Sequence, residues 1–368
     1  MLERKSMKKI IFVFFIIIFN VTTAFCEEKE KKEEKKENST VKSSPFIIPA
    51  FIYSSDTGFG AGIAGIISYH TSSSKASIVQ FASIYTEKKQ FTLSTHWQHL
   101  FHGDKNSLAI QSAYVRFPKD FFGLGNNTSN ENPESFTPEF IFARLFYERV
   151  LINHFKIKAQ FFIRNQSLVQ SKPNGILKSS SIPWNTGRFD AGPGIGFLWD
   201  SRDNYHATKR GTLAQFEYRG LMLQDKGGAF NTFSFDVRTF FNPFSEYVFG
   251  NMFWLVDSRG DIPFYLLSML GGSDRLRGYE SDRFIGKSLI LFQHDIRFPI
   301  WGPFGGIVFI ASGRVADNIN SLFSGKYHTG YGLGLRYFID KKDNLVVRFD
   351  TAFGSDSKGT YITFSEAF

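Results

Sequence analysis

Hydrophobic and polar residues alternate along 285–298, and this stretch guides the interpretation of the whole chain. One face holds large apolar side chains, and the other ends in an aspartate and an arginine. The first face is Ile290, Phe292, His294, Ile296 and Phe298, and the second is Leu289, Leu291, Gln293, Asp295 and Arg297. Side chains of a strand point to opposite faces in turn. A strand that is apolar outward and polar inward is typical of a membrane barrel, so we predict a transmembrane strand here.

The same kind of pattern recurs from residue 46 to the end of the chain, whereas helical periodicity is nearly absent. About sixteen alternating or aromatic-rich stretches follow one another at the spacing expected of membrane strands. They lie near 46–53, 58–70, 76–86, 88–101, 105–117, 136–149, 152–165, 187–200, 211–219, 230–242, 246–259, 285–298, 304–316, 328–339, 343–353 and 358–367. The predicted fold is therefore all-β: a transmembrane antiparallel β-barrel of about 16 strands.

The lengths of the connections favour an up-and-down barrel. The long ones all follow odd-numbered strands and lie at 118–135, 166–186, 220–229, 260–284 and 317–327. Most connections after even-numbered strands are short, and only 201–210 is of intermediate length. Outer-membrane barrels have long loops outside the cell and short turns in the periplasm, whereas a soluble sandwich gives no reason for such a difference.

The composition fits this fold and argues against some others. The 368 residues include 44 Phe, and 17% of the chain is aromatic, which suits strands and interfacial girdles. A mean hydropathy of -0.17 is too polar for a bundle of membrane helices. The net charge of +9 is scattered over strands and loops, so nucleic-acid binding is not expected. The charge instead favours anions in a pore or contact with acidic lipid.

The first 45 residues predict export followed by a tether. Basic residues precede the apolar run 10–19 and small residues follow it, which is the pattern of a secretory signal peptide over 1–26. The alternative is a lipoprotein acylated at Cys26, although the bulky residue before it argues against this. Residues 27–45 begin with a mixed-charge run and are expected to be a disordered tether. We therefore expect a Gram-negative outer-membrane protein with its barrel at 46–368.

Charged residues in later strands also keep to one face. Asp236 alternates with phenylalanines in 230–240, and Asp350 alternates with apolar residues in the strand near 343–353. A charge on the lipid face costs about 2–4 kcal/mol at the membrane midplane, so these carboxylates are expected in the lumen. The barrel assembly machinery, the expected partner for membrane insertion, reads an aromatic terminal strand. The last strand here ends in an aromatic residue but is interrupted by Glu366.

Four short motifs, in this order, give the chain a resemblance to a known family. They are Phe-Gly-Leu-Gly-Asn at 122–126, Asp-Ser-Arg-Asp-Asn at 200–204, Gly-Gly and then Arg-Gly-Tyr within 271–279, and Asp-x-Arg-x-Pro at 295–299. Together they resemble the barrel of the Omp85 superfamily, specifically of BamA/TamA-type outer-membrane proteins with a bacterial surface antigen domain. The resemblance extends over about residues 46–368.

The resemblance implies that a large loop between the eleventh and twelfth strands folds back into the lumen. The loop motif is Arg277, Gly278 and Tyr279, and its arginine would face acidic groups of the barrel wall. A guanidinium in a narrow lumen needs a matching carboxylate. Asp295 is the preferred partner, and the two luminal aspartates named above are the alternatives. An exposed turn without such a pair is the competing interpretation.

Further residues are assigned by the same resemblance, and two features depart from it. Arg297 is placed on the lumen wall, and Asp200, Arg202 and Asp203 in a salt-bridged periplasmic turn rather than a metal site. The short charged segment before the barrel leaves no room for POTRA domains, so none is expected. Residues 311–313 are Ala-Ser-Gly, where the family often has an acidic residue, so we expect a rearranged wall network.

The sequence contains no motif for covalent chemistry. It lacks a GxSxG elbow, an HExxH pair, a P-loop and Cys/His ligand spacing, so we expect no enzyme, metal or cofactor. The leading hypothesis is transport, insertion or assembly of protein or lipid at the outer membrane. The expected partners are outer-membrane lipid and nascent outer-membrane proteins. The alternatives are a porin-like channel for small anionic solutes and a barrel hydrolase that would use His294 on its outer wall.

Overall fold

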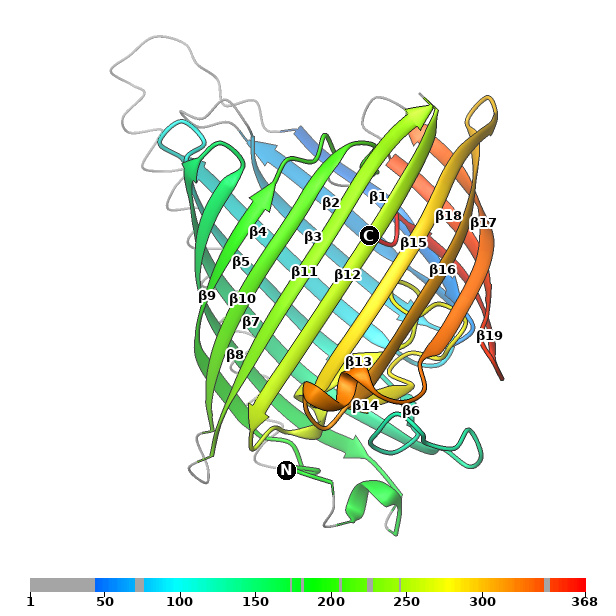
Figure 1. Cartoon of the computed structure of the whole chain (residues 1–368). Coiled ribbons are helices and arrows are strands. Elements are labelled where there is room, and N and C mark those ends of the chain that lie inside the picture. Colours follow the sequence, from blue (N-terminus) through cyan, green and yellow to red (C-terminus); the bar gives the residue numbers. More distant parts are fainter. Residues whose placement is uncertain are drawn as a thin grey trace.

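A closed antiparallel barrel makes up most of the computed structural model, which describes residues 44–69, 76–172, 174–179, 182–204, 207–223, 228–244, 246–340 and 345–368. Sixteen strands form the ring, because β1 pairs with β2 on one side and with β19 on the other (Figure 1). The predicted all-β barrel is thus confirmed. The predicted signal peptide 1–26 lies outside the described residues, as does all of the predicted tether 27–45 except its last two residues.

The barrel strands follow one another in chain order around the ring. The first eight are β1 Ser44–Ser54, β2 Gly58–Tyr69, β3 Ser77–Thr86, β4 Phe91–Phe101, β5 Asn106–Arg116, β7 Glu134–Ile152, β8 Phe155–Gln170 and β9 Phe189–Asp200. The second eight are β10 Gly211–Leu223, β11 Ala229–Phe244, β12 Tyr247–Gly260, β15 Ser288–Trp301, β16 Phe304–Ala316, β17 His328–Asp340, β18 Leu345–Phe353 and β19 Lys358–Phe364.

The remaining elements are short and lie in the connections. They are strand β6 Lys119–Phe121, which extends the pairing of β7, the hairpin of β13 Ser268–Leu270 and β14 Phe284–Gly286, and the 3₁₀ turns η1 Ile176–Lys178, η2 Phe264–Leu266 and η3 Asn320–Phe323. Among the residues described, no helix is long and apolar enough to cross a bilayer.

Long and short connections gather at opposite ends of the barrel, which we name the loop end and the turn end (Figure 1). The loop end carries the long connections 117–133, 171–188, 261–287 and 317–327, which confirms four of the five predicted long ones. All four follow odd positions in the ring. The connection after β10 is shorter than expected, because that strand continues to Leu223. In outer-membrane barrels of known orientation, the end with short turns faces the periplasm.

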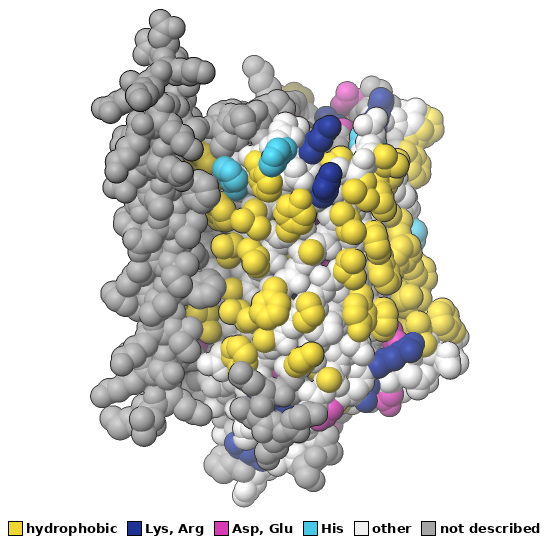
Figure 2. All heavy atoms as spheres, turned by 90° about the vertical axis from the view of Figure 1, so that its left-hand side faces the viewer, with side chains coloured by type: hydrophobic (Ala, Val, Ile, Leu, Met, Phe, Trp, Pro, Cys, Tyr) yellow, Lys and Arg dark blue, Asp and Glu magenta, His cyan; other side chains and the backbone are white. Residues whose placement is uncertain are grey.

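The outer wall carries a band of exposed apolar side chains. Figure 2 shows these side chains over the middle of the wall, with Lys, Arg and His side chains near its upper end and charged groups near its lower end. On β15 the outward residues Phe292 and Ile296 are exposed, while the inward Gln293 and Asp295 are buried. Exposed aromatic and aliphatic side chains with polar borders are what a lipid-facing wall requires. The alternation found in the sequence therefore assigns the two faces correctly.

Candidate functional site in the barrel lumen

The segment 261–287, between β12 and β15, lies against the inner wall of the barrel, and we call it the luminal segment. Its hairpin β13–β14 and the turns around it bury apolar side chains with β15 and β16. This cluster includes Leu270, Leu276, Tyr279, Phe284, Leu289, Leu291 and Val315. Gly271 and Gly272 have φ values of +126° and +96°, which only glycine adopts without strain. The glycine pair of the motif therefore makes the turn that starts the segment's return.

Arg277 of the luminal segment is joined to the barrel wall by a buried ion pair. Its Nη1 lies 2.7 Å from Asp350 Oδ2 on β18, and the two side chains are 1% and 0% exposed. The guanidinium also stacks over Phe309, with its central carbon 3.4 Å from the ring centroid. Burial lowers the pKa of Arg277, and the charge of Asp350 opposes that shift. The pair fixes the tip of the segment to the wall.

The partner of Arg277 differs from the one preferred from the sequence. Asp295 pairs with Arg297 of its own strand at 3.0 Å, although both point into the lumen as predicted. Asp350, one of the alternatives, makes the pair instead. Asp236, the other alternative, pairs with Arg238 at 2.7 Å. The path of the luminal segment places its arginine beside β18, so strand alternation alone did not identify the carboxylate.

Gly278 and Tyr279 pack against β17, β18 and β19. These strands lie next to the seam, the junction of β1 and β19 at which the barrel closes. The Gly278 N–H donates to the Tyr361 hydroxyl at 3.1 Å, and a Cβ at Gly278 would lie 2.7 Å from the carbonyl carbon of Phe353. Its φ of +96° is a second reason for glycine. The Tyr279 hydroxyl donates to the Thr329 carbonyl at 3.2 Å. The three motif residues therefore contact β17, β18 and β19 together.

This network has four further members that were not predicted as partners of the loop motif: Arg336, Arg348, Asp274 and Tyr361. Arg336 on β17 bonds both Asp350, at 2.6 Å, and Glu366, at 2.9 Å. Arg348 on β18 pairs with Asp274 of the luminal segment. The Tyr361 hydroxyl accepts the hydrogen bond from the Gly278 N–H. The available signal was alternation, because a charge that shares a face with Asp350 must also point into the lumen.

The chain after β19 turns into the lumen and lies against its inner wall. Ser365 has a φ of +64°, where β19 ends and the backbone changes direction. Glu366 then pairs with Arg336, and Phe368 packs on Phe240 of β11. The Arg297 Nη2 donates to the Phe368 carbonyl at 3.3 Å. This tail, residues 365–368, therefore contacts β17, β15 and β11 along the inner wall.

The predicted turn residues lie at the turn end, as a salt-bridged turn requires. Arg202 Nε lies 2.9 Å from Asp200 Oδ1. The Asp203 N–H donates to the Arg210 carbonyl at 3.1 Å, and its Oδ1 accepts from the Lys209 N–H at 3.0 Å. Each carboxylate is used within the turn. Among the described residues, no group of three or more His, Cys, Asp and Glu side chains is arranged to hold a metal ion.

The Phe-Gly-Leu-Gly-Asn motif ties three loops together at the loop end. The Gly125 N–H donates to the Ile285 carbonyl at 2.7 Å. Asn126 Oδ1 accepts from the Val315 N–H at 3.1 Å, its Nδ2 donates to the Lys326 carbonyl at 2.9 Å, and its carbonyl accepts from His328 Nε2 at 2.8 Å. Asn126 thus links the loop before β7 to β16, β17 and the loop between them, while Gly125 links it to β14.

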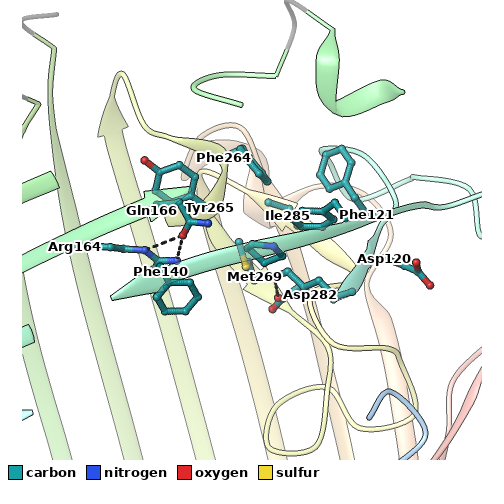
Figure 3. A pocket seen from close by; sticks show the side chains of 13 residues that line it. Asp120, Phe121, Phe140, Arg164, Gln166, Phe264, Tyr265, Met269, Asp282 and Ile285 are labelled. Atoms are coloured by element: carbon teal, nitrogen blue, oxygen red, sulfur yellow. Dashed lines mark hydrogen bonds and ion pairs between the residues drawn. The ribbon is translucent and has the colours of Figure 1, made fainter. Parts of the chain in front are cut away.

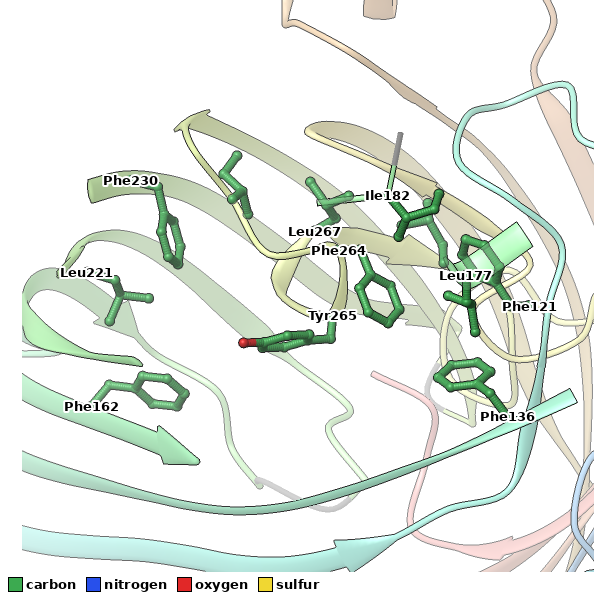
Figure 4. Close-up of a cluster of buried hydrophobic side chains, with 12 residues drawn as sticks. Phe121, Phe136, Phe162, Leu177, Ile182, Leu221, Phe230, Phe264, Tyr265 and Leu267 are labelled. Carbon is green, nitrogen blue, oxygen red and sulfur yellow. The ribbon is translucent and has the colours of Figure 1, made fainter. Parts of the chain in front are cut away.

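An apolar cluster packs in the lumen at the loop end. Figure 4 shows phenylalanines and leucines from β6, β7, η1 and the luminal segment pointing toward one another; the cluster includes Phe121, Phe136, Leu177, Ile182, Leu221, Phe230 and Phe264. Beside it lies a cavity of about 30 Å³, the size of one water, which Arg164, Gln166 and Tyr265 help to line (Figure 3). Burial and the nearby Asp190 raise the pKa of Tyr265, whose hydroxyl donates to that carboxylate at 3.1 Å. The loop end is therefore packed rather than open.

His294, the candidate for a hydrolase, lies on the outer wall. Its Nδ1 is 2.8 Å from Asn251 Oδ1, and its direct neighbours across the two adjoining strands are Asn251 and Ile310. Neither neighbour is a nucleophile, so the cross-strand pairs beside His294 do not form a Ser–His dyad.

No protein-family model matches the sequence, and no curated protein matches it. Solved structures share the fold. BamA from Haemophilus ducreyi lacking POTRA domains 1–3 superposes with a TM-score of 0.62 at 12% identity, over 94% of this chain and 78% of that one. CdiB from Acinetobacter baumannii gives 0.57 at 13% identity, over 88% of this chain and 65% of that one, which is less than two thirds of CdiB. The shared fold is the 16-stranded barrel that the sequence motifs predict.

Proposed function

We propose that this chain is an Omp85-type barrel of a Gram-negative outer membrane that moves or inserts protein or lipid there. It works by movement of the wall and the luminal segment, without covalent chemistry. The fold shared with BamA and CdiB supports the proposal, as does the order of the four motifs. The proposal includes export by a signal peptide and location in the outer membrane.

The observation that carries the proposal is the weak seam between β1 and β19. All eleven residues of β1 have a partner on β2, but its register with β19 comprises only Tyr53 with Ile362 and Ser54 with Tyr361. Few main-chain hydrogen bonds therefore have to break for the wall to part at this place. An opening in the wall gives a cargo a lateral path from the lumen into the bilayer, which a uniformly paired barrel does not offer.

The packed loop end favours this function over a porin. A pore for small solutes needs an open aqueous path, whereas the luminal segment and the apolar cluster occupy the loop end. The buried pair of Arg277 and Asp350 holds that segment in place. The arrangement suits a barrel that stays closed to solutes while its wall opens to the membrane.

A disulfide across the seam tests the proposal in cells. The variant Tyr53→Cys/Ile362→Cys, in a Cys26→Ser background, joins directly opposite residues of β1 and β19. We expect the oxidised variant to fail to replace the wild-type protein, with altered protein or lipid content of the outer membrane, and reductant to restore function. The matched control Ile63→Cys/Ser83→Cys joins opposite residues of β2 and β3 and should function under both conditions. Full function of the locked seam would overturn the proposal.

A further inference from the structure

The register across the seam identifies the luminal face of β1. Asp350 bonds Arg277 of the luminal segment, and Tyr361 lies opposite Asp350 on β19. Ser54 lies opposite Tyr361 across the seam. Side chains alternate along a strand. The residues of β1 that share the face of Ser54 are therefore Phe46, Ile48, Ala50 and Ile52.

The luminal face of β1–β3 forms a surface that we call the apolar strip. The register from β1 to β3 places small and branched apolar residues on this face: Gly60, Gly62, Ala64 and Ile66 of β2, and Ile78, Ala82 and Ile84 of β3. Gln80 lies among them, and hydroxyl residues occupy the strand ends. A Cβ at Gly60 would lie 2.8 Å from Ile52 Cγ1, which agrees with a shared face.

The apolar strip belongs to an uncharged part of the lumen wall, formed by β1 to β5, five of the sixteen barrel strands. Within strands β1 to β5 as described, no luminal position is Asp, Glu, Lys or Arg. The opposite wall is rich in them, including Arg144, Lys158, Arg164, Asp190, Glu217, Arg219, Asp236, Arg238, Asp295, Arg297, Arg336, Arg348 and Asp350. Aqueous barrels are usually polar inside, and apolar surface is unfavourable in water. The apolar strip is therefore suited to an apolar occupant.

The apolar strip reaches the membrane through the seam. In the described chain β19 pairs with β1 only near Tyr53, and residues 44–52 have no register partner on that side. At this free edge Phe46 is 55% exposed on the luminal face, and Ile47 is 60% exposed on the outer face. The tail turns inward instead of continuing along β1. Apolar surface is thus continuous from the lumen to the lipid-facing wall.

Two prolines make this free edge a poor template for another strand. The Ser55 N–H donates to Thr360 across the seam, so every second residue before Ser55 directs its backbone toward the seam. Pro45 and Pro49 are among them and have no N–H to donate. Strand addition depends on successive main-chain hydrogen bonds. The edge therefore disfavours a protein strand, while its side chains suit hydrocarbon.

A pocket of about 160 Å³ lies at the turn end among β12, β15, β16, β17 and the tail, and we call it the basic pocket. Its charged lining residues are Lys209, Arg297 and Arg336 together with Glu246 and Glu366. Glu366 bonds Arg336 Nε, but Arg336 Nη2 and Arg297 Nε are buried and have no hydrogen-bond partner among the described residues. Guanidinium groups match phosphate oxygens. Because its three cationic side chains outnumber its two carboxylates, the pocket favours a phosphate headgroup at the turn end.

We propose that the cargo of this barrel is a diacyl phospholipid. Its phosphate lies in the basic pocket, its acyl chains lie along the apolar strip, and the chains leave through the unpaired seam into the bilayer. The inference rests on the proposed function and specifies its cargo. It also makes the seam a path for lipid rather than a site where protein strands are added.

Photocrosslinking tests where acyl chains lie. The full chain is reconstituted in phosphatidylethanolamine and phosphatidylglycerol vesicles that contain a phosphatidylglycerol with a diazirine in one acyl chain, and adducts are mapped by mass spectrometry. Lipid around the barrel will label outward residues such as Ile63 in any case. We expect adducts on the luminal residues Ile48, Ile66 and Ile78 as well. Adducts confined to outward residues would overturn the inference.

A charge placed in the apolar strip supplies the matched comparison. Ile66→Glu should reduce luminal adducts by about tenfold or more, because a carboxylate is poorly tolerated beside acyl chains. Gln215→Glu adds the same charge on the charged wall of the lumen and should leave the adducts unchanged. If Ile66→Glu does not give a heat-modifiable barrel, Ile66→Gln replaces it. Equal labelling in both variants would contradict the inference.

The outcome for the cargo is separable from the outcome for the proposed function. Crosslinking uses purified barrel and asks only whether lipid enters the lumen. Seam locking in cells asks whether an opening wall is needed at all. Absence of luminal adducts together with a failing locked seam would remove phospholipid as cargo and retain the transport or insertion function. Luminal adducts together with a functional locked seam would retain the lipid site and remove the proposed path.

Discussion

At the scale of single residues, the buried pair of Arg277 and Asp350 should contribute most to holding the luminal segment. Removing one member of a buried ion pair leaves the other uncompensated, at a cost of about 3–5 kcal/mol. Asp350 keeps Arg336 as a second partner at 2.6 Å, so we expect the lower end for Arg277→Ala, about 3 kcal/mol. Urea unfolding of the barrel in lipid vesicles measures this loss.

A second luminal pair provides the control for that measurement. Arg238 and Asp236 lie 2.7 Å apart, but their side chains are 26% and 16% exposed. Because water screens this pair, Arg238→Ala should cost about 1 kcal/mol or less. Equal losses in the two variants would show that the luminal segment is not held by the buried pair.

Glu366 gives the tail a dependence on pH. It follows the last strand and so lies outside the membrane-spanning segments. Burial alone would raise its pKa, but the charges of Arg336 and then Arg297 outweigh burial and lower the pKa from 4.5 to about 2. A carboxyl group whose pKa is lower in the folded protein stabilises the fold at pH values above its unfolded pKa. This stability is lost as the pH falls toward its folded pKa.

The corresponding measurement is barrel stability between pH 5 and pH 2. We expect the urea midpoint of the wild type to fall over the window from about 4.5 to about 2. Glu366→Gln keeps the size of the side chain and removes the charge, so its midpoint should start lower and change less. Parallel pH profiles of the two proteins would exclude Glu366 as the group responsible.

Residue-scale prediction from the sequence succeeded for faces and failed for partners. Alternation places Asp295, Arg297 and Asp350 in the lumen, as the structure does. It does not predict which strands the luminal segment packs against, and that position decides which carboxylate pairs with Arg277. The same limit applies to Glu366, because the inward turn at Ser365 changes its strand position into a luminal contact.

At the scale of elements, the prolines of β1 should prevent other strands from pairing with its free edge. The double variant Pro45→Ala/Pro49→Ala restores two N–H groups on the free edge. An unpaired edge with its full set of donors pairs readily with other strands. We therefore expect the double variant to form dimers through β1, detected by disulfide crosslinking of Ile47→Cys between copies. Pro138→Ala, on β7, which is paired on both sides, is the control and should remain monomeric.

A failure to dimerise would show that the free edge is protected by something other than its prolines. In that case the preference for hydrocarbon over protein strands would rest on the side chains of the apolar strip alone.

Element bounds were predictable in the membrane and less so beyond it. The sixteen strands occur where the sequence places them, because a lipid-facing wall imposes strict alternation. At the loop end β7 and β8 run further than predicted, as Glu134–Ile152 and Phe155–Gln170. Outside the bilayer a strand no longer needs an apolar face, so the pattern that marks its ends is lost.

At the scale of the whole molecule, closure and topology followed from the lengths of connections. Long connections after odd strands predicted one loop end and one turn end, and the barrel has both (Figure 1). The division of the lumen into an uncharged part, β1 to β5, and a charged remainder was also present in the alternation of these strands. It became visible once the seam register showed which face of β1 points inward.

The luminal segment should decide whether the barrel conducts ions. A 16-stranded barrel is wide enough for an aqueous channel unless something fills it. Here the apolar cluster and the buried arginine pair fill the loop end, while the basic pocket leaves space at the turn end. Replacing residues 264–284 with a short Gly-Ser linker removes η2, β13 and the first residue of β14 but leaves every barrel strand intact. We expect the wild type to give little steady current in planar bilayers and the replacement to give large, stable steps.

Arg277→Ala discriminates between a fixed plug and a movable one. If the segment is held chiefly by the arginine, this variant should flicker between the two conductance levels, because the apolar contacts still favour the closed arrangement. If the apolar packing alone holds it, Arg277→Ala will conduct like the wild type despite its lower stability. Identical currents in all three proteins would mean that the tail at 365–368, which also lies in the lumen, closes the barrel. Glu366→Ala in the linker variant would then be the change that opens it.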